Sequence, residues 1–543
     1  MEKNQKKLMF ILSIVVAIFT IGIVPKTFQN DTFFNVAIGE YILENGIDMK
    51  EHFSWVPDNL DYGYSHWAFD IVTHQIYNHF GFTGIYVSVI IFSIITTVTL
   101  FNLLSKRSKS PIIAFCVTLL SAYIVNDAFT ARSQLISFLC FIIEIYCIEQ
   151  FIETNQKRYA VLLIVQAIIV ANFHAATWPL LLVLFLPYIA PPILNKFSSK
   201  NIYKVCIKKL EKKIAKLPKD SKKIEEYQKD IVYYQKLIDE PKGKYADYKI
   251  VYSQNYNFKN LIILMIIVAF TGLITPIQGT PYTYIIKSMF GPSNFENAIS
   301  INYINEMQAL VPIESLGFIV FSVVILGFLI FVPSKLKVEH GFLLLGLLLM
   351  TLTSRRYCYL LVLLGAYPLT SIISSAATLL IDNDIKLLEK LFIHPITVSV
   401  LTALVLIFTI SNVLEKVDNP YVNPKLYPTE AVEYIKNNLD YENIRIFNSY
   451  NNGSYLMLNH IPVFIDSRLD VYCSEFNDTD IFKDFIYSSY GNQNYKEIFD
   501  KYDFSHVLLE KESLIYNYIS SDSDYKLIHE DDAYVLYEKT LKN

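Results

Sequence analysis

The chain has 543 residues, of which 53% are hydrophobic, and its formal net charge is −4 at pH 7. The mean hydropathy of +0.32 excludes an ordinary soluble protein, because soluble chains of this length carry more polar residues. The net charge says little about partners, and its distribution along the chain says more. We expect no nucleic-acid partner.

Apolar stretches recur along the chain and predict a polytopic α-helical membrane protein with about eleven transmembrane helices. Inside lipid these stretches must be helical, because every backbone polar group needs a partner within the protein. The first stretch has no small-residue cleavage site at its end, so we interpret it as an uncleaved anchor. The predicted spans are residues 8–25, 84–104, 111–127, 134–152, 159–176, 179–196, 258–275, 315–333, 340–353, 357–380 and 393–413.

Lysine and arginine residues predict the orientation of these spans, because cytoplasmic loops carry an excess of them. The basic segments fall on one side, at residues 3–7, 106–109, 157–158, 196–249 and 335–337. We therefore expect a multi-pass protein of the plasma membrane with a cytoplasmic N-terminus. Loops 26–83 and 276–311 and the tail after residue 414 are then extracytoplasmic.

The first outer loop contains two predicted helices. Apolar residues share one face of residues 30–42, which indicates an amphipathic helix lying along the membrane surface. Asp31 stands at its start, where the carboxylate either caps the helix or belongs to a site. His66 and Trp67 begin a second amphipathic helix, and Trp67 is either part of the same site or an interfacial anchor.

Polar residues also mark the outer ends of later spans. Asn172 and His174 end the fifth span, Arg132 precedes the fourth, and Arg355 and Arg356 precede the tenth. The planar guanidinium of an arginine can bind a phosphate through two parallel hydrogen bonds. Snorkelling into lipid headgroups is the alternative for each arginine, and a satisfied interfacial residue is the alternative for His174. Three arginines on the side where basic residues are disfavoured favour a binding site for an anion.

Residues 198–250 form a Lys-rich insert with two apolar stripes around the turn at Leu217-Pro218. We predict an antiparallel helical hairpin in the cytoplasm, either simply solvated or docking a cytoplasmic partner or a lipid surface. The resulting organisation has a transmembrane core at 1–197 that includes the first outer loop 26–83, the insert at 198–257, further transmembrane helices at 258–414, and a soluble α/β domain at 415–543.

In the tail, a helical pattern at 428–438 alternates with strand-like runs, which predicts an α/β domain with a mostly parallel sheet. The expected strands are residues 444–447, 462–465, 506–509, 526–529 and 534–537. Loops at the carboxyl ends of parallel strands bind ligands in such folds. The candidates there are Asn452, Tyr455, Asp466 and Arg468. Alternatively, Asn452 lies in a simple turn, and Asp466 and Arg468 form an internal ion pair.

Short motifs follow one another in a recognisable order, with the pair in the tail the most specific. They are Asp31-Thr32-Phe33-Phe34-Asn35 with Gly39, Ser65-His66-Trp67-Ala68, Arg132-Ser133-Gln134, Asn172-Phe173-His174, Ile304-Asn305-Glu306-Met307, Ser354-Arg355-Arg356, and Tyr450–Leu456 followed by Pro462–Arg468. In this order the chain resembles the GT-C superfamily of integral-membrane glycosyltransferases, in particular a bacterial branch with an extracytoplasmic α/β tail. Asn35 stands where that branch usually has His, and the second, third and fifth motifs lack its Glu, Pro and Trp.

The resemblance implies a transferase that moves a sugar from a polyprenyl-phosphate donor to an extracytoplasmic glycan, lipid or protein acceptor, with inversion. It implies Asp31 as general base, Arg355 and Arg356 with Arg132 in reserve as phosphate ligands, and His174 and Glu306 as positioning residues. We predict no cofactor. A divalent metal remains conceivable, because Asp31, Glu40, His66 and His174 offer ligand atoms.

Three other functions are compatible with parts of the pattern. A polymerase or ligase acting on lipid-pyrophosphate glycans also places arginines at the outer face, but it favours a large outer loop between late spans. A transporter or flippase favours broken helices and midplane charges, whereas these spans are mostly apolar apart from Glu144 and Gln166. A scaffold with an inactive site is the third.

Overall fold

The computed structural model describes most of the chain. The described residues are 2–56, 59–108, 110–195, 199–218, 221–239, 250–251, 258–290, 303–311, 315–332, 334, 336–380, 394–491 and 494–540. Part of the predicted outer loop 276–311 and the beginning of the predicted span 393–413 fall outside these residues.

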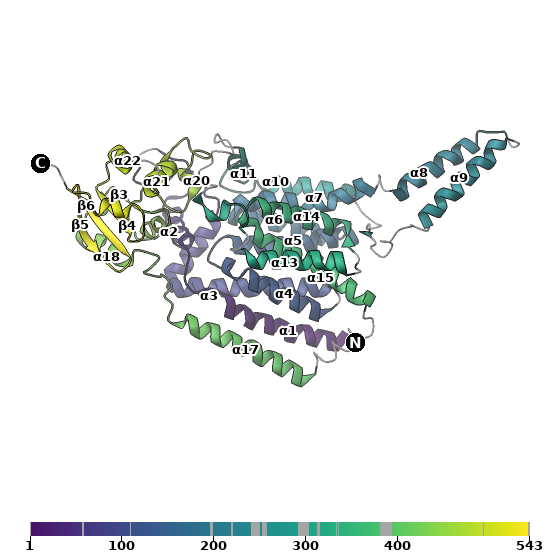
Figure 1. Cartoon of the computed structure of the whole chain (residues 1–543), viewed down its shortest axis with the longest axis horizontal. Helices are drawn as coiled ribbons and strands as arrows, with labels where there is room; N and C mark the ends of the chain where they lie inside the picture. The colour runs from purple at the N-terminus through teal and green to yellow at the C-terminus, as the bar shows by residue number, and fades with distance from the viewer. Residues whose placement is uncertain are drawn as a thin grey trace.

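A bundle of long helices running side by side makes up the body of the molecule (Figure 1). The helices are α1 (Glu2–Ile23), α3 (Trp67–Ser108), α4 (Pro111–Ile124), α5 (Gln134–Thr154), α6 (Lys157–Phe173), α7 (Trp178–Asn195), α10 (Phe258–Thr271), α13 (Leu316–Phe331), α14 (Val338–Thr353), α15 (Cys358–Leu380) and α17 (Pro395–Val417). One of them lies at each predicted span. Among the described residues, six helices are long and apolar enough to cross a membrane, and four shorter ones are apolar, so the chain is a polytopic membrane protein.

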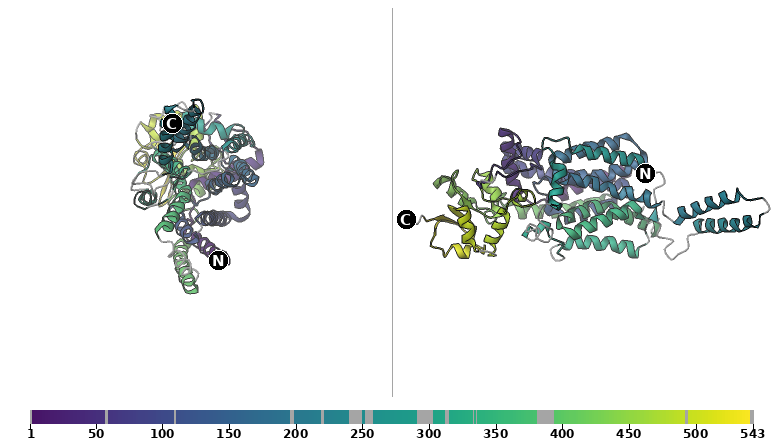
Figure 2. Two further views of the ribbon diagram at one scale, coloured as in Figure 1. Left: turned by 90° about the vertical axis from the view of Figure 1, so that its right-hand side faces the viewer. Right: turned by 90° about the horizontal axis from the view of Figure 1, so that it is seen from above.

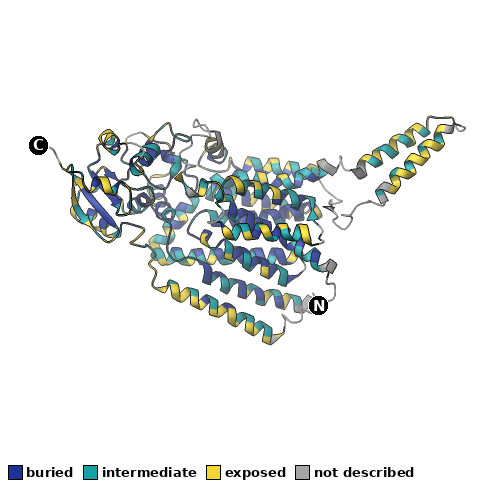
Figure 3. Ribbon diagram, in the orientation of Figure 1, coloured by how far each residue is buried: buried dark blue, intermediate teal, exposed yellow. Residues whose placement is uncertain are grey.

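Burial within the bundle follows the environment that each helix meets. Helices α5 and α15 are buried at the centre, whereas α17 presents exposed apolar side chains such as Leu404 and Ile407 at the edge (Figure 3). Lipid is as apolar as these side chains, so their exposure carries no cost in a membrane. Helix α17 packs on α1 through small residues, because a Cβ at Gly22 would lie 2.9 Å from the Cα of Thr409.

The two ends of the bundle carry different units. The N-terminus and the hairpin of α8 (Ser199–Ile214) and α9 (Lys222–Asp239) lie at one end, and the C-terminal domain lies at the other (Figures 1 and 2). The predicted helical hairpin is confirmed. The short parallel pair β1 (Ile250–Val251) and β2 (Leu336–Lys337) lies outside the C-terminal sheet. The assignment of the hairpin end to the cytoplasm, and of the opposite end to the outside, stays a prediction. We call the end of the bundle that carries the C-terminal domain the outer end.

Helix α2 (Asn30–Asn45) forms where the first outer-loop helix was predicted, but it is buried inside the protein instead of exposing one face. Nearly all of its residues from Thr32 to Ile42 are buried, because α3 covers one side and the C-terminal domain covers another. Gly39 permits the approach to α3, since a Cβ there would lie 2.1 Å from the carbonyl oxygen of Asp70. The second predicted helix is confirmed and begins at Trp67, and it bends into the transmembrane part of α3 at Gly81, which has φ +59°.

Short elements connect the helices at this outer end and beside the C-terminal domain. They are η1 (Asn126–Ala128), η2 (Ala175–Thr177), α11 (Thr280–Phe290), η3 (Asn305–Met307) and η4 (Arg355–Tyr357).

The C-terminal domain is α/β as predicted, but its sheet is not mostly parallel. The strand order is β3-β4-β6-β5, in which only β3 and β4 are parallel. Strands β5 and β6 are joined by three residues, which permits only a hairpin. The elements are α18 (Thr429–Asn438), β3 (Ile446–Phe447), α19 (Tyr450–Leu458), α20 (Leu469–Tyr472), α21 (Ile481–Ser489), α22 (Tyr495–Tyr502), β4 (His506–Glu510), α23 (Tyr516–Ile519), β5 (Tyr525–Glu530) and β6 (Tyr534–Lys539).

The predicted strand at 462–465 pairs with the first outer loop instead of joining this sheet. The amide of Val463 donates to the carbonyl of Phe53 at 3.0 Å, and the amide of Trp55 donates to the carbonyl of Val463 at 3.1 Å. The Asn448 side chain satisfies further backbone groups of this segment, accepting from the amide of Phe464 at 2.9 Å. The loop and the domain therefore share one hydrophobic core and fix each other's position.

Candidate active site

Arg132 occupies the centre of a charged cluster at the outer end of the bundle. Its guanidinium pairs with the Asp31 carboxylate on one side and, at 2.7 Å, with the Glu306 carboxylate on the other. The three side chains come from the start of α2, the segment before α5 and η3. The Arg132 side chain is 23% exposed and that of Glu306 is 47% exposed, so the cluster is open to a ligand.

Asp31 does not cap its helix, and the capping interpretation is therefore wrong. The N-cap residue is Gln29, which makes no side-chain cap, and Asp31 is the second residue inside α2. Its own amide is satisfied by the Asn30 side chain at 3.0 Å. The Asp31 carboxylate is thus free to pair with Arg132. Because Asp31 stands at the start of α2, the ion pair lies at the outer end of the bundle.

The two carboxylates differ in their electrostatic surroundings. Burial raises the pKa of Asp31, and the charge of Glu306 raises it further, against the lowering effects of Arg132 and a hydrogen bond with Ser467. Burial acts in the same direction on Glu306, but Arg132 and Arg356 outweigh it and lower the pKa of that carboxyl. Carboxyl groups with pKa values pushed apart take different chemical roles, and Asp31 is the more basic of the two.

Two histidines approach the cluster from α6 and the first outer loop. The rings of His66 and His174 lie 5.7 Å apart, and His174 Nδ1 lies 2.8 Å from the hydroxyl of Ser137. Burial and the charge of Arg132 lower the pKa of His66 to about 4, so its imidazole is neutral at physiological pH. The Nδ1 atom of His66 has no hydrogen-bond partner within the described residues and is available to a ligand.

The neighbouring predicted residues Asn172 and Trp67 have different surroundings. The Asn172 amide donates to the carbonyls of Ile168 at 2.8 Å and Ile274 at 2.9 Å, which ties the end of α6 to the segment before α11. The indole nitrogen of Trp67 is buried without a partner in the described part of the chain. Asn172 therefore supports the frame, whereas Trp67 retains an unused donor next to His66.

The arginines of η4 are not equivalent. Arg355 binds the segment after η3, donating from Nε to the carbonyl of Ala309 at 3.2 Å and from Nη2 to the side chain of Gln308 at 3.1 Å. Arg356 is exposed and makes neither a hydrogen bond nor an ion pair with any described residue, yet its charge acts on Glu306. Arg356 is therefore the better placed of the two for an anionic ligand.

Arg468 and Asp466 of the C-terminal domain lie inside the protein, and the interpretation as an internal ion pair is confirmed. Arg468 pairs with Glu51 through both terminal nitrogens, at 2.6 and 2.9 Å, and with Asp466 at 2.6 Å. Its guanidinium also stacks on Phe53 and Tyr62, with 5.1 and 4.9 Å to the ring centroids. These contacts join the domain to the first outer loop.

Asn452 lies within α19, so the interpretation of this position as a turn is wrong. Its amide donates to Glu510 at 2.6 Å and the side chain is fully buried. The neighbouring Gly453 is needed for packing, because a Cβ there would lie 2.0 Å from the carbonyl of Ile465. Tyr455 packs edge-on against Phe33 of α2, with 5.2 Å between ring centroids.

Ser467, Tyr450 and Tyr284 were not singled out as site residues from the sequence, although the first two lie in the paired tail motifs. Ser467 hydrogen-bonds with Asp31, and the charge of Asp31 acts on Tyr450 and Tyr284. A signal for Ser467 is present, because alternate residues of an extended segment point in opposite directions and its neighbours Asp466 and Arg468 point inward. Tyr450 begins its motif, whereas nothing in the local sequence points to Tyr284.

The residues named as conceivable metal ligands do not form a ligand set in the described residues. Only Glu430, His529 and Asp531 bring suitable atoms within 4.8 Å of one another there, and they lie in the C-terminal domain. Glu40 lies near His460, 3.9 Å from it, and not beside Arg132. The expectation of no metal stays a prediction.

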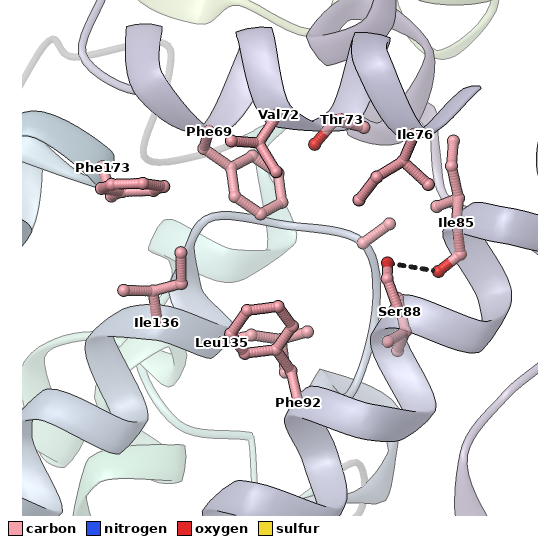
Figure 4. A pocket seen from close by; sticks show the side chains of 12 residues that line it. Phe69, Val72, Thr73, Ile76, Ile85, Ser88, Phe92, Leu135, Ile136 and Phe173 are labelled. Atoms are coloured by element: carbon pink, nitrogen blue, oxygen red, sulfur yellow. Dashed lines mark hydrogen bonds between the residues drawn. The ribbon is translucent and has the colours of Figure 1, made fainter. Parts of the chain in front are cut away.

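An apolar crevice of about 50 Å³ adjoins the cluster (Figure 4). Phe69, Val72 and Ile76 of the outer part of α3 form one wall, and Ile85 and Phe92 of its transmembrane part form another. Ala131, directly before Arg132, and Leu135 are among the other lining residues. Because Ala131 precedes Arg132 directly, the apolar crevice lies next to the charged cluster.

The fold of this chain resembles those of two proteins of known structure. No family model and no curated protein matches the sequence. Among solved structures, the oligosaccharyltransferase of Archaeoglobus fulgidus in the apo form has a TM-score of 0.51 at 10% identity, over 93% of this chain and 70% of its own. ArnT from Cupriavidus metallidurans bound to undecaprenyl phosphate has a TM-score of 0.50 at 9% identity, over 99% of this chain and 98% of its own. Both of these proteins are GT-C glycosyltransferases.

The chain has the GT-C fold. The resemblance identified from the order of the motifs is thereby confirmed for the fold, and the likeness to ArnT extends over nearly the whole of both chains. A GT-C protein is polytopic, in agreement with the helical bundle described above.

Proposed function

We propose that this GT-C protein is a glycosyltransferase that moves a sugar from a polyprenyl-phosphate donor to an extracytoplasmic acceptor with inversion. The observation that carries the proposal is the open cluster in which Arg132 lies between a more basic carboxyl, Asp31, and a less basic one, Glu306. A structural neighbour, ArnT, is described with undecaprenyl phosphate bound, which supports a lipid phosphate as the donor carrier.

The donor phosphate would bind at Arg132 and Arg356. A guanidinium offers planar, paired donors that fit phosphate oxygens, and fixed cations stabilise the charge that grows on a leaving phosphate. Arg356 has no partner among the described residues, and Arg132 has two carboxylates that a phosphate could replace. The first part of the lipid chain would lie against the apolar crevice beside Ala131.

Asp31 would act as the general base. Pairing with Arg132 holds the Asp31 carboxylate ready but weakens it as a base, and a phosphate that takes over Arg132 releases it. The acceptor hydroxyl then gives its proton to Asp31 while its oxygen bonds to the anomeric carbon. The bond from that carbon to the phosphate oxygen breaks, and the phosphate leaves with the electron pair. Donor binding and base activation are coupled in this scheme.

The neutral His66 and His174 would hold sugar hydroxyls without adding charge. His66 Nδ1 has no partner in the described part of the protein, and the His174 ring is oriented by Ser137. A neutral imidazole does not compete with the phosphate for the arginines or with Asp31 for the proton.

The decisive experiment compares purified wild-type protein with Asp31→Asn in the presence of polyprenyl-phosphate sugars and a cell-envelope extract. Wild type should consume a donor and release polyprenyl phosphate, and Asp31→Asn should not. Asp478→Asn, an exposed residue of the C-terminal domain, is the matched control and should behave as wild type. Equal consumption by wild type and Asp31→Asn would remove Asp31 as the base. Use of pyrophosphate-linked glycans alone would indicate the polymerase function, and lipid movement without transfer would indicate a flippase.

A further inference from the structure

A polar cavity of about 350 Å³ lies at the outer end between the first outer loop, α11 and α20. This volume is within the range of roughly 300–1,000 Å³ that is typical of small-ligand sites. Its walls come from three parts of the chain, and they are polar with a few aromatic rings. The lining residues that matter here are Lys50, Tyr62, Thr283, Tyr284, Lys287 and Asp470.

The cavity adjoins the site around Asp31. Tyr284 lines the cavity, and the charges of Asp470, Arg356 and Asp31 all act on its hydroxyl. A second link runs along the backbone, since Ser467 reaches Asp31 and Asp470, three residues later, lines the cavity. Tyr284 and the segment from Ser467 to Asp470 therefore link the cavity to the site around Asp31.

Hydrogen-bonding groups in the cavity remain unused. The hydroxyl of Tyr62 is buried without a partner in the described residues, and Tyr62 is only 2% exposed. The Asp470 carboxylate forms no ion pair there, and burial raises its pKa to about 6 although Arg468 opposes this, so it accepts hydrogen bonds at neutral pH. A buried polar group without a partner costs stability, and a ligand that supplies the partner recovers it.

The charged groups in the cavity wall balance one another. The Lys50 ammonium lies 2.6 Å from the Asp61 carboxylate, and the Lys287 ammonium, which donates to the carbonyl of Phe476 at 3.3 Å, is offset by the Asp470 carboxylate in the same wall. The lining therefore carries no excess of positive charge to attract an anionic ligand. Aromatic rings with unused hydroxyl and carboxylate groups suit a ligand with apolar faces and many uncharged hydroxyls.

We propose that this cavity binds the acceptor and that the acceptor is an uncharged saccharide, whose reactive hydroxyl faces Asp31 past Tyr284. The proposal rests on the proposed function, because it names the second substrate of the same site. The donor lipid would reach Asp31 from the apolar crevice, and the acceptor would reach it from the opposite, polar side.

The test measures binding of neutral trisaccharides of glucose, mannose and N-acetylglucosamine to the purified full chain, with undecaprenyl phosphate binding as a second readout. Thr283→Trp fills the cavity, because the Thr283 side chain is exposed at its wall. Thr154→Trp is the matched control, since Thr154 is also exposed and also bonds a carbonyl four residues earlier, but at the other end of the bundle. Tyr62→Phe removes a single hydroxyl.

We expect a trisaccharide to bind wild type and Thr154→Trp alike and not to bind Thr283→Trp. Tyr62→Phe should bind it about two- to tenfold more weakly, the range for one hydrogen bond. All four proteins should bind undecaprenyl phosphate equally. Undiminished trisaccharide binding by Thr283→Trp would overturn the proposal. It would also be overturned if wild type bound glycerol-phosphate oligomers and no neutral trisaccharide, or bound neither. Loss of undecaprenyl phosphate binding in wild type, with trisaccharide binding intact, would instead refute the proposed function.

Discussion

Arg132 and Arg468 are each held between two carboxylates at the outer end, yet their surroundings differ. The Arg468 side chain is 1% exposed, pairs with both oxygens of Glu51 and lies on two aromatic rings. The Arg132 side chain is 23% exposed, and one of its partners, Glu306, is itself exposed. An arginine whose donors are all satisfied inside the protein stabilises structure, whereas one with exchangeable partners can bind a ligand.

The largest expected effect comes from breaking the buried cluster. Arg468→Gln would leave Glu51 and Asp466 as uncompensated buried charges, which should cost about 3–5 kcal/mol of stability. The measurement is the thermal unfolding of the purified protein together with proteolysis of the C-terminal domain. Arg132→Gln is the matched control and should unfold near the wild-type temperature. Equal destabilisation by the two variants would remove the distinction between the clusters.

Arg132→Gln should instead strongly reduce transferase activity. Loss of one fixed donor to a developing negative charge typically reduces turnover by about 10²–10³. Undecaprenyl phosphate binding and donor consumption are the measurements, and both should fall in a protein that remains folded. Full donor binding by this variant would show that the phosphate lies elsewhere.

The two arginines of η4 should separate in the same assay. Arg356→Gln should weaken donor binding by about one order of magnitude or more, because a charge-assisted hydrogen bond contributes about 1.5–3 kcal/mol. Arg355→Gln should mainly loosen the segment that it binds and should affect donor binding less. The comparison needs donor affinity and unfolding temperature for both variants. A larger loss of affinity in Arg355→Gln would reverse the assignment.

The smallest effect is a shift in pH dependence. Asp31 must be unprotonated to act as a base, so kcat/KM should rise with pH through its pKa, which burial raises above the usual carboxyl range. The negative charge of Glu306 contributes to the raised pKa of Asp31. Glu306→Gln should therefore lower the pKa of Asp31 and move the acid limb of the pH profile to lower pH. An acid limb that stays in place, in a variant that still turns over, would show that another group controls it.

The sequence by itself determined the elements whose formation depends on nearby residues. Apolar stretches indicated a helix at each of the spans, since lipid leaves the backbone no other way to satisfy its polar groups. The hairpin at 198–250 and the α/β character of the tail followed from local periodicity as well. The candidate residues Asp31, Arg132 and Glu306 were named from the sequence, but their mutual contact was not.

Only the tertiary structure decided which arginine is buried and which is open. Glu51, Asp466 and Arg468 meet across more than 400 positions, and the local pattern around Arg468 resembles that of any charged turn. The same long-range packing buried α2 and drew residues 462–465 to the first outer loop. Burial and partner choice depend on contacts between distant segments, and such contacts leave no periodic signal in the sequence.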